Sequence, residues 1–238
     1  MTDSPSLEEA IAQRGITRVC HFTPSRNLPR ILKDGSIRPT RDLEEDVRAC
    51  YAETDLLRLD GHKEMVCCTI EYPNVYYLDR ARHDPGAVNF PDWAILLIDP
   101  AVLMRKGALY CTGNAARHRA ATARAGSGGF LAAYAASVVG SNDYTFHRRS
   151  THLASCPTDL QAEVLLPGPI SVAHLLSVVV ANEDQALRES ARLAQLEVPK
   201  VGFDWVIAPV LFQRDNLREM IWRGERPQEV TWTPRSEA

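Results

Sequence analysis

The chain has 238 residues, of which 45% are hydrophobic and 24% are charged, and its formal net charge is −3. This length suits one sizeable globular domain or two small ones, and the net charge excludes a protein whose whole surface is basic for binding nucleic acid. No apolar run approaches the ~20 residues of a membrane-spanning helix, and the chain does not begin like a secretory signal, so we expect a cytoplasmic protein without a membrane partner. Its six cysteines include no C-x-x-C pair, which indicates reduced thiols and no structural metal.

Hydrophobic periodicity and turn-forming residues predict strands and short helices along the whole chain. In the first half we expect a helix that begins with a capping box of Ser6 and Glu9 and ends at Gly15, a strand at 17–22, and a helix that Asn27 caps and Gly35 ends. A helical segment at 41–59, strands at 65–70 and 75–77, and a buried strand at 93–98 follow. The second half is expected to hold a helical turn at 99–103, a strand at 108–111, an Ala-rich helix at 115–126 that Asn114 caps and Gly126 to Gly129 end, a second Ala-rich segment at 130–139 and a polar loop at 140–157. After these we expect strands at 160–166 and 175–181, a helix at 183–196, a strand pair or one long strand at 203–212 and an irregular tail after Trp222. No repeat or long linker divides this order, so we predict a single α+β domain over residues 1–238.

Gln161 and Glu163 are the first candidates for chemistry. Because alternate residues of a strand point to the same side, the predicted strand at 160–166 places both side chains on one face. A polar pair directly after a long aromatic and basic loop is the pattern of a catalytic carboxylate at the edge of a cleft. A solvated edge strand has the same pattern and is the commoner cause of it.

His21 ends the first predicted strand, and the turn and helix that follow hold Thr23, Asn27 and Gly35. Such a unit offers an imidazole, a hydroxyl and helix N-terminal N–H groups to a ribose or a phosphate, although a histidine in such a run is more often structural. Arg58 either forms a surface ion pair or holds a phosphate or a base edge through two hydrogen bonds.

The polar loop at 140–157 combines basic and aromatic side chains, namely Tyr144, Phe146, His147, Arg148 and Arg149. This mixture suits single-stranded nucleic acid, where bases stack and phosphates pair with arginine, although solubilising charge explains each group as well. The chain has no H-E-x-x-H, no G-x-S-x-G and no glycine-rich phosphate loop. A nuclease of the restriction-enzyme type is disfavoured, since position 165, two residues after Glu163, is leucine.

Four stretches, in this order, resemble the DarT family of DNA ADP-ribosyltransferase toxins. They are VCHFTPSRNLPRILKDGSI, LLRLDG, LYCTGNAA and LQAEVLLPGPI, and all four lie within residues 17–171. The resemblance implies an ADP-ribosyltransferase-like split β-sheet with surrounding helices, NAD+ as co-substrate, no metal, and glycosyl transfer of ADP-ribose to a base of single-stranded DNA, typically thymidine. It also implies a toxin of a toxin–antitoxin or phage-defence system, commonly partnered by a macrodomain antitoxin of the DarG type.

The same resemblance implies roles for individual residues. Glu163 matches the catalytic glutamate and Arg58 the active-site arginine, while the NAD+-binding motif corresponds to His21, Thr23, Asn27 and Gly35. The loop before the glutamate implies substrate binding by Tyr144, His147, Arg148, Arg149 and Gln161. The Gln-x-Glu order occurs in enzymes that modify amides or nucleobases, whereas Glu-x-Glu is typical of arginine modifiers.

Several alternatives stay open at this point. The segment VCCTIEYPNVYY departs from the aromatic, proline-containing segment of the family, and this keeps guanosine open as the target base. The same chemistry on RNA or protein is the nearest rival, followed by a non-catalytic nucleic-acid-binding module of the same fold. A hydrolase or nuclease is the third, and it would require a divalent metal.

Overall fold

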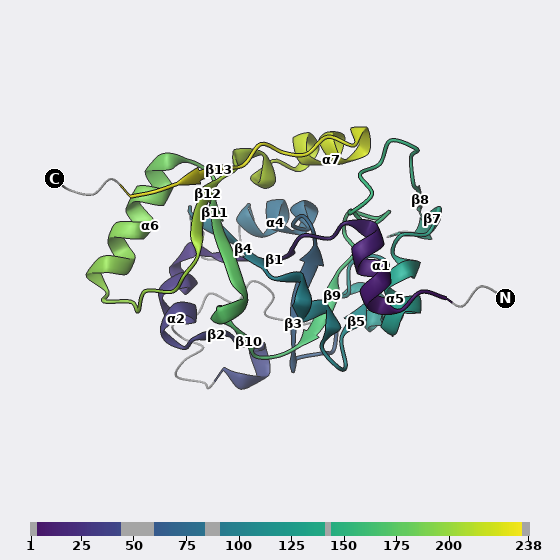
Figure 1. Ribbon diagram of the computed structural model, residues 1–238, viewed down its shortest axis with the longest axis horizontal. Coiled ribbons are helices and arrows are strands. Elements are labelled where there is room, and N and C mark those ends of the chain that lie inside the picture. Colours follow the sequence, from purple (N-terminus) through teal and green to yellow (C-terminus); the bar gives the residue numbers. More distant parts are fainter. Residues whose placement is uncertain (1–3, 44–59, 84–90, 141–143, 235–238) are drawn as a thin grey trace.

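The computed structural model describes residues 4–43, 60–83, 91–140 and 144–234. Its centre is a nine-stranded sheet with the strand order β13-β12-β11-β4-β1-β3-β9-β5-β6 (Figure 1). The strands of this sheet are β1 (Val19–Pro24), β3 (Met65–Ile70), β4 (Trp93–Ile98), β5 (Leu109–Tyr110), β6 (Arg124–Ala125), β9 (Val164–Pro167), β11 (Leu175–Val180), β12 (Asp204–Ile207) and β13 (Val230–Trp232). Two short ladders join β2 (Ser36–Ile37) to β10 (Ile170–Ser171) and β7 (Ser137–Val139) to β8 (Thr145–His147).

The sheet divides between β1 and β3. Val19 and Cys20 of β1 pair with Ile70 and Thr69 of β3, but from His21 onward β1 pairs with β4 alone. The first four residues of β3 pair with β9 instead. The end of β1 and the start of β3 therefore diverge, which confirms the split sheet implied by the sequence resemblance. We call this divergence, between β1 after Cys20 and β3 before Thr69, the split of the sheet.

The helices cover both faces of the sheet. They are α1 (Leu7–Arg14), α2 (Leu28–Lys33), α4 (Val75–Arg82), α5 (Gly126–Ala132), α6 (Glu183–Gln195) and α7 (Arg214–Arg223), with short 3-10 turns η1 (Ser25–Asn27), η2 (Thr40–Asp42), η3 (Pro100–Met104), η4 (Arg117–Ala120), η6 (Val172–His174) and η7 (Pro209–Phe212). One apolar cluster takes side chains from α1, α2, α5 and α6, and a second takes them from α4 and α7. Within the described ranges, no helix is long and apolar enough to span a membrane.

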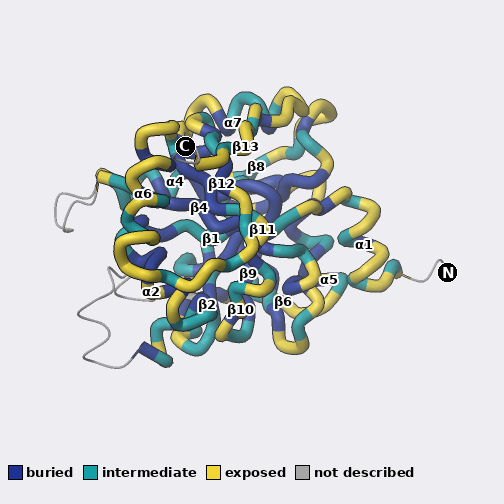
Figure 2. Tube along the Cα trace, turned by 60° about the vertical axis from the view of Figure 1, so that its left-hand side comes forward, coloured by how far each residue is buried: buried dark blue, intermediate teal, exposed yellow. Residues whose placement is uncertain are grey.

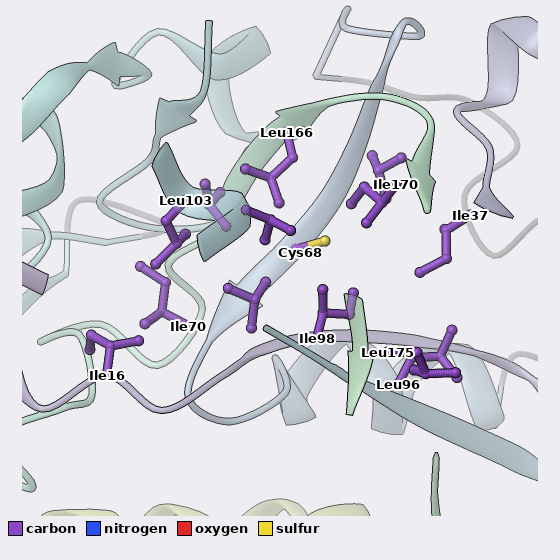
Figure 3. Packing of buried hydrophobic residues seen from close by; sticks show 14 of the residues in the cluster. Ile16, Ile37, Cys68, Ile70, Leu96, Ile98, Leu103, Leu166, Ile170 and Leu175 are labelled. Atoms are coloured by element: carbon purple, nitrogen blue, oxygen red, sulfur yellow. The ribbon is translucent and has the colours of Figure 1, made fainter. Parts of the chain in front are cut away.

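Strand β4 shows how the sequence encodes this layering. Leu96 and Ile98 belong to the first cluster (Figure 3), whereas the alternate residues Ile95 and Leu97 belong to the second. A strand covered on both faces is apolar at every position rather than at every second one, which explains the continuous run of 93–98. The burial map agrees, because dark blue is concentrated along the central strands, whereas yellow segments occur mainly on the outer helices and loops, mixed there with teal and blue (Figure 2).

Several predicted elements are confirmed. Helix α1 begins with the expected capping box between Ser6 and Glu9 and ends at Gly15 in the left-handed conformation. Strands β3, β4, β5 and β11, the turn η3 and helix α6 lie where the patterns predict them. The segment predicted as a helix at 41–59 begins with η2, and residues 44–59 lie outside the described part of the chain.

Other predictions are wrong, and each error has a local cause. Residues 75–77 form the first turn of α4 rather than a strand, because the Asn74 side chain caps the backbone N–H of Tyr77. The Ala-rich helix expected at 115–126 is replaced by η4 and the short strand β6, since Ala120 has a φ of +58°, which a continuous right-handed helix excludes. Gly126, where this helix is expected to end, is instead the first residue of α5.

The C-terminal third and the loop region also differ from expectation. The strand predicted at 203–212 is β12 followed by η7, and the tail holds α7 and β13. The segments 130–139 and 140–157 contribute β7 and β8, which form a hairpin. The strand expected at 160–166 begins only at Val164, because the preceding residues turn around the Asp159 side chain, which accepts from the Gln161 N–H at 2.9 Å.

Candidate active site

Glu163 lies immediately before β9 and is only 6% exposed. Its Oε1 accepts hydrogen bonds from the Nδ2 groups of Asn74 at 3.0 Å and Asn114 at 3.1 Å. Its Oε2 accepts from the backbone N–H of Ala115 at 2.6 Å, and the Cys67 side chain is a further hydrogen-bond partner. Donors from the start of α4, from the loop after β5 and from β3 therefore hold one carboxyl group.

Burial raises the pKa of Glu163 to about 7. The hydrogen bonds from Ala115, Asn74 and Cys67 act in the opposite direction, and the nearby Asp60 carboxyl raises the pKa further. A buried carboxyl whose pKa lies near neutrality, and which is surrounded by hydrogen-bond donors, is typical of a catalytic group.

His21 is the first residue of β1 beyond the pairing with β3. Its Nδ1 lies 3.0 Å from the backbone oxygen of Cys67. Because a carbonyl oxygen only accepts, this contact places a hydrogen on Nδ1 and makes Nε2 the acceptor nitrogen of the neutral ring. Cys67 thus contacts His21 through its carbonyl and Glu163 through its side chain, so both predicted residues lie next to the same residue of β3.

Thr23, Asn27 and Gly35 follow His21 around α2. Thr23 and Asn27 are buried, and Asn27 Nδ2 donates to Thr23 Oγ1 at 2.8 Å. The Asn27 side chain makes no capping hydrogen bond to α2, so its predicted capping role is wrong, because the amide ties the end of β1 to the helix instead. Gly35 ends α2 with a φ of +67°, at the far end of the helix from Asn27.

Gln161 does not share a strand face with Glu163, because β9 starts after both residues. The expected alternation of side chains therefore does not apply, and Ala162 and Glu163 are both buried whereas Gln161 is half-buried. The prediction of a shared strand face is wrong because a turn that leads into a strand can have the same spacing of polar residues as an exposed strand.

The loop residues occupy different environments. Arg148 donates to the backbone oxygens of Cys156, Leu153 and Ala154 at 2.8, 3.0 and 3.2 Å, so its guanidinium organises the loop from within. Arg149 lies 4.0 Å from the centre of the Trp222 ring and is exposed.

The β7–β8 hairpin carries the other predicted loop residues. Tyr144 is 63% exposed and packs edge-on against Phe146, with ring centres 4.9 Å apart. His147 is exposed at the end of β8. Arg58 lies outside the described residues. Across the described ranges, no group of three or more His, Cys, Asp and Glu side chains is arranged to hold a metal ion.

Sequence reasoning missed Asn74 and Cys67, and it assigned Asn114 only a capping role. The Asn114 Oδ1 does accept from the Ala116 N–H at 2.9 Å, but there is no long helix for it to cap. The Pro-Asn pair before VYYLDRAR is a helix-start signal that would have found Asn74 as a cap. No local signal could have shown that its amide reaches Glu163.

Comparison with known proteins points to one family. A family model described as "ssDNA thymidine ADP-ribosyltransferase, DarT" matches residues 20–204. No curated protein matches the sequence significantly.

Solved structures show the same fold at low sequence identity. The structure of Thermosipho africanus DarTG in complex with ADP-ribose has a TM-score of 0.57 and 16% identity, and the match covers 82% of this chain and 51% of that one. The structure of Thermus sp. 2.9 DarT in complex with ADP-ribosylated ssDNA has a TM-score of 0.55 and 11% identity, with coverages of 83% and 97%. The chain therefore spans about half the length of the first relative and nearly all of the second.

Proposed function

Because the chain belongs to the DarT family, whose model spans residues 20–204, we propose that it transfers ADP-ribose from NAD+ to a base of single-stranded DNA, with thymidine as the target. The observation that carries this proposal is the buried Glu163 at the split of the sheet, with His21 anchored to the same residue, Cys67. The likeness in fold to a DarT solved with ADP-ribosylated ssDNA supports it.

Glu163 and His21 have complementary roles in this reaction. As the nicotinamide–ribose bond breaks, the ionised Glu163 stabilises the positive charge that develops on the ribose. Nicotinamide leaves with the electron pair of that bond, a ring nitrogen of the base forms the new bond to the ribose, and the N–H proton of the base is released. His21 holds the ribose through Nε2 and so orients the reacting carbon.

We assign the remaining NAD+ contacts to the neighbourhood of α2 and to Arg58. Thr23 and Asn27 shape the turn that follows His21, and their mutual hydrogen bond of 2.8 Å keeps that turn rigid. Gly35 provides the left-handed residue that ends α2. Arg58 is assigned to the diphosphate or to the base, where it would favour the anionic base that attacks.

The β7–β8 hairpin and the loop that follows it are the proposed DNA-binding region. The exposed Tyr144 ring offers a stacking surface to a base, and Arg149, held against Trp222, offers a charge to the backbone. His147 extends this surface. Arg148 acts through the loop that it orders, and Gln161 is assigned to the base edge because it lies two residues before Glu163.

The biological setting follows from the same family. We propose a cytoplasmic toxin, formed by one domain over residues 1–238, whose DNA modification is reversed by a macrodomain antitoxin of the DarG type. Incubation of modified DNA with such a macrodomain should restore the unmodified mass, and a stable modification would contradict this pairing.

The deciding experiment is intact-mass analysis of single-stranded oligonucleotides after incubation with the protein and NAD+ in the presence of a chelator. Three oligonucleotides separate the bases: one of mixed sequence, one without thymidine and one without guanosine. The expected result is a gain of one ADP-ribose per modified base, lost with the oligonucleotide that lacks thymidine. Glu163→Ala should abolish the gain, whereas Glu225→Gln, at an exposed position, should keep it.

Each rival function has its own outcome. Modification only of the oligonucleotides that contain guanosine would change the base, and labelling of RNA or lysate protein alone would remove DNA as the target. DNA binding without NAD+ consumption would identify a non-catalytic module. Cleavage of DNA that appears when divalent metal replaces the chelator would identify a nuclease.

A further inference from the structure

Two asparagines from distant parts of the chain meet at one oxygen of Glu163. Asn74 lies between β3 and α4, and Asn114 lies in the loop after β5. Both donate an amide N–H to Oε1, at 3.0 and 3.1 Å. Asn74 is fully buried, so its amide N–H is not exposed to water.

The orientation of each amide is set by the backbone. Asn74 Oδ1 accepts from the N–H of Tyr77 at 3.1 Å, and Asn114 Oδ1 accepts from the N–H of Ala116 at 2.9 Å. Because a backbone N–H only donates, each side-chain oxygen must face it and each NH2 group must face Glu163. Each asparagine therefore uses its oxygen to close a local turn and its nitrogen to hold the carboxyl group.

We propose that Asn74 and Asn114 are positioning residues that hold Glu163 as an oriented carboxylate for the transfer of ADP-ribose. This inference rests on the proposed function. Donors that face a carboxylate stabilise its ionised form and restrict its rotation, whereas an acceptor at the same place favours the protonated form. The two amides thus select the form of Glu163 that stabilises positive charge on the ribose.

The chain allows a substitution that separates this role from helix capping. Asn74→Asp and Asn114→Asp keep the oxygen that closes each turn, since Asp caps as well as Asn, but replace the donor by an acceptor next to Oε1. Asn182 caps α6 by accepting from the N–H of Gln185 at 2.8 Å and makes no such contact with Glu163. Asn182→Asp is therefore the matched control.

The first measurement is the pH dependence of transfer to DNA. Asn74→Asp and Asn114→Asp should each lower kcat by roughly tenfold or more, the loss expected for one charge-assisted hydrogen bond, with a smaller change in KM for NAD+. The acid limb of kcat/KM should move to higher pH in both, because a like charge faces Glu163 in addition to its other titratable neighbours, Asp60, Cys67 and Cys111. Asn182→Asp should leave kcat and the profile unchanged.

The second measurement observes Glu163 without turnover. Infrared difference spectra between each protein and its Glu163→Gln counterpart give the protonated carboxyl band of Glu163 as a function of pH. The midpoint of this band should rise in the Asn74→Asp background and stay in place in the Asn182→Asp background. Asn74→Ser, which keeps a capping side chain without adding charge, replaces Asn74→Asp if the aspartate variant does not fold, and it should lower kcat.

The outcomes distinguish this inference from the proposed function. If the wild-type protein modifies no DNA, the proposed function fails, and the infrared titration alone decides whether the asparagines hold the carboxylate. If folded Asn74→Asp and Asn114→Asp proteins keep the wild-type kcat and the wild-type midpoint of Glu163, the two asparagines are turn-forming residues only and the inference is overturned.

Discussion

The free energy of unfolding of Glu163→Gln, compared with that of the wild type, should become larger as the pH rises from acidic to alkaline. The pKa of Glu163 rises from the ordinary value of 4.5 to about 7 because the folded protein buries it. A raised pKa means that the folded chain binds the proton more tightly than the unfolded chain does. The stability that this group contributes is therefore fully present below pH 4.5 and is lost as the pH rises through about 7.

The size of the effect follows from the two pKa values. Each unit of difference between the folded and unfolded chain is worth about 1.4 kcal/mol, so the rise from 4.5 to about 7 corresponds to about 3 kcal/mol. The free energy of unfolding of the wild type should fall by about this amount, relative to Glu163→Gln, between pH 4.5 and pH 8. Loss of hydrogen bonds in the variant adds an offset that does not depend on pH.

The assay is urea unfolding of both proteins across this pH range, with the difference between them plotted against pH. Taking the difference cancels the titration of other groups that both proteins share. Glu225→Gln removes a carboxylate from an exposed position, where water solvates the charge before and after folding, so its difference from the wild type should change far less. A difference for Glu163→Gln that is independent of pH, or that favours the wild type as pH rises, would refute the reasoning.

Other perturbations test the remaining parts of the site. His21→Ala should weaken NAD+ binding by roughly tenfold in calorimetric titration through loss of a ribose hydrogen bond, and an unchanged affinity would remove His21 from the site. Arg148→Ala leaves three loop carbonyls without their donor and should lower the free energy of unfolding by about 2 kcal/mol. The variant should therefore have a lower Tm, which Arg148→Lys does not restore, whereas a wild-type Tm would show that the loop is ordered without Arg148. The kcat/KM of the wild type should decrease below about pH 7 as Glu163 is protonated, and a profile that stays level down to pH 5 would contradict a role for its carboxylate. The affinity for labelled single-stranded DNA, measured by fluorescence anisotropy, should decrease as the salt concentration rises, and an affinity independent of salt would argue against contacts with the DNA backbone. Arg149→Ala should reduce the slope of log affinity against log salt concentration by about 1, whereas Tyr144→Ala should weaken binding at every salt concentration.

Features set by neighbouring residues could be predicted from the sequence. The capping box at Ser6, the end of α1 at Gly15 and the buried strand β4 are confirmed, because helix capping, a left-handed glycine and a continuous apolar run depend on residues close in the chain. The family resemblance extends this reach, since it points to Glu163 and His21 from the sequence alone.

Features set by long-range contacts could not be predicted in this way. The local sequence around Asn74 indicates a helix cap, yet its amide also donates to the buried carboxyl group of Glu163. The loop sequence around Arg148 indicates a solvated side chain, yet its guanidinium donates to backbone carbonyls inside the loop. The polar spacing of Gln161 and Glu163 suggested an exposed strand, whereas folding buries Glu163 and raises its pKa. Burial and hydrogen-bond partners come from segments far apart in the chain, so the chemistry of Glu163 arises only when β3, α4 and the loop after β5 pack around it.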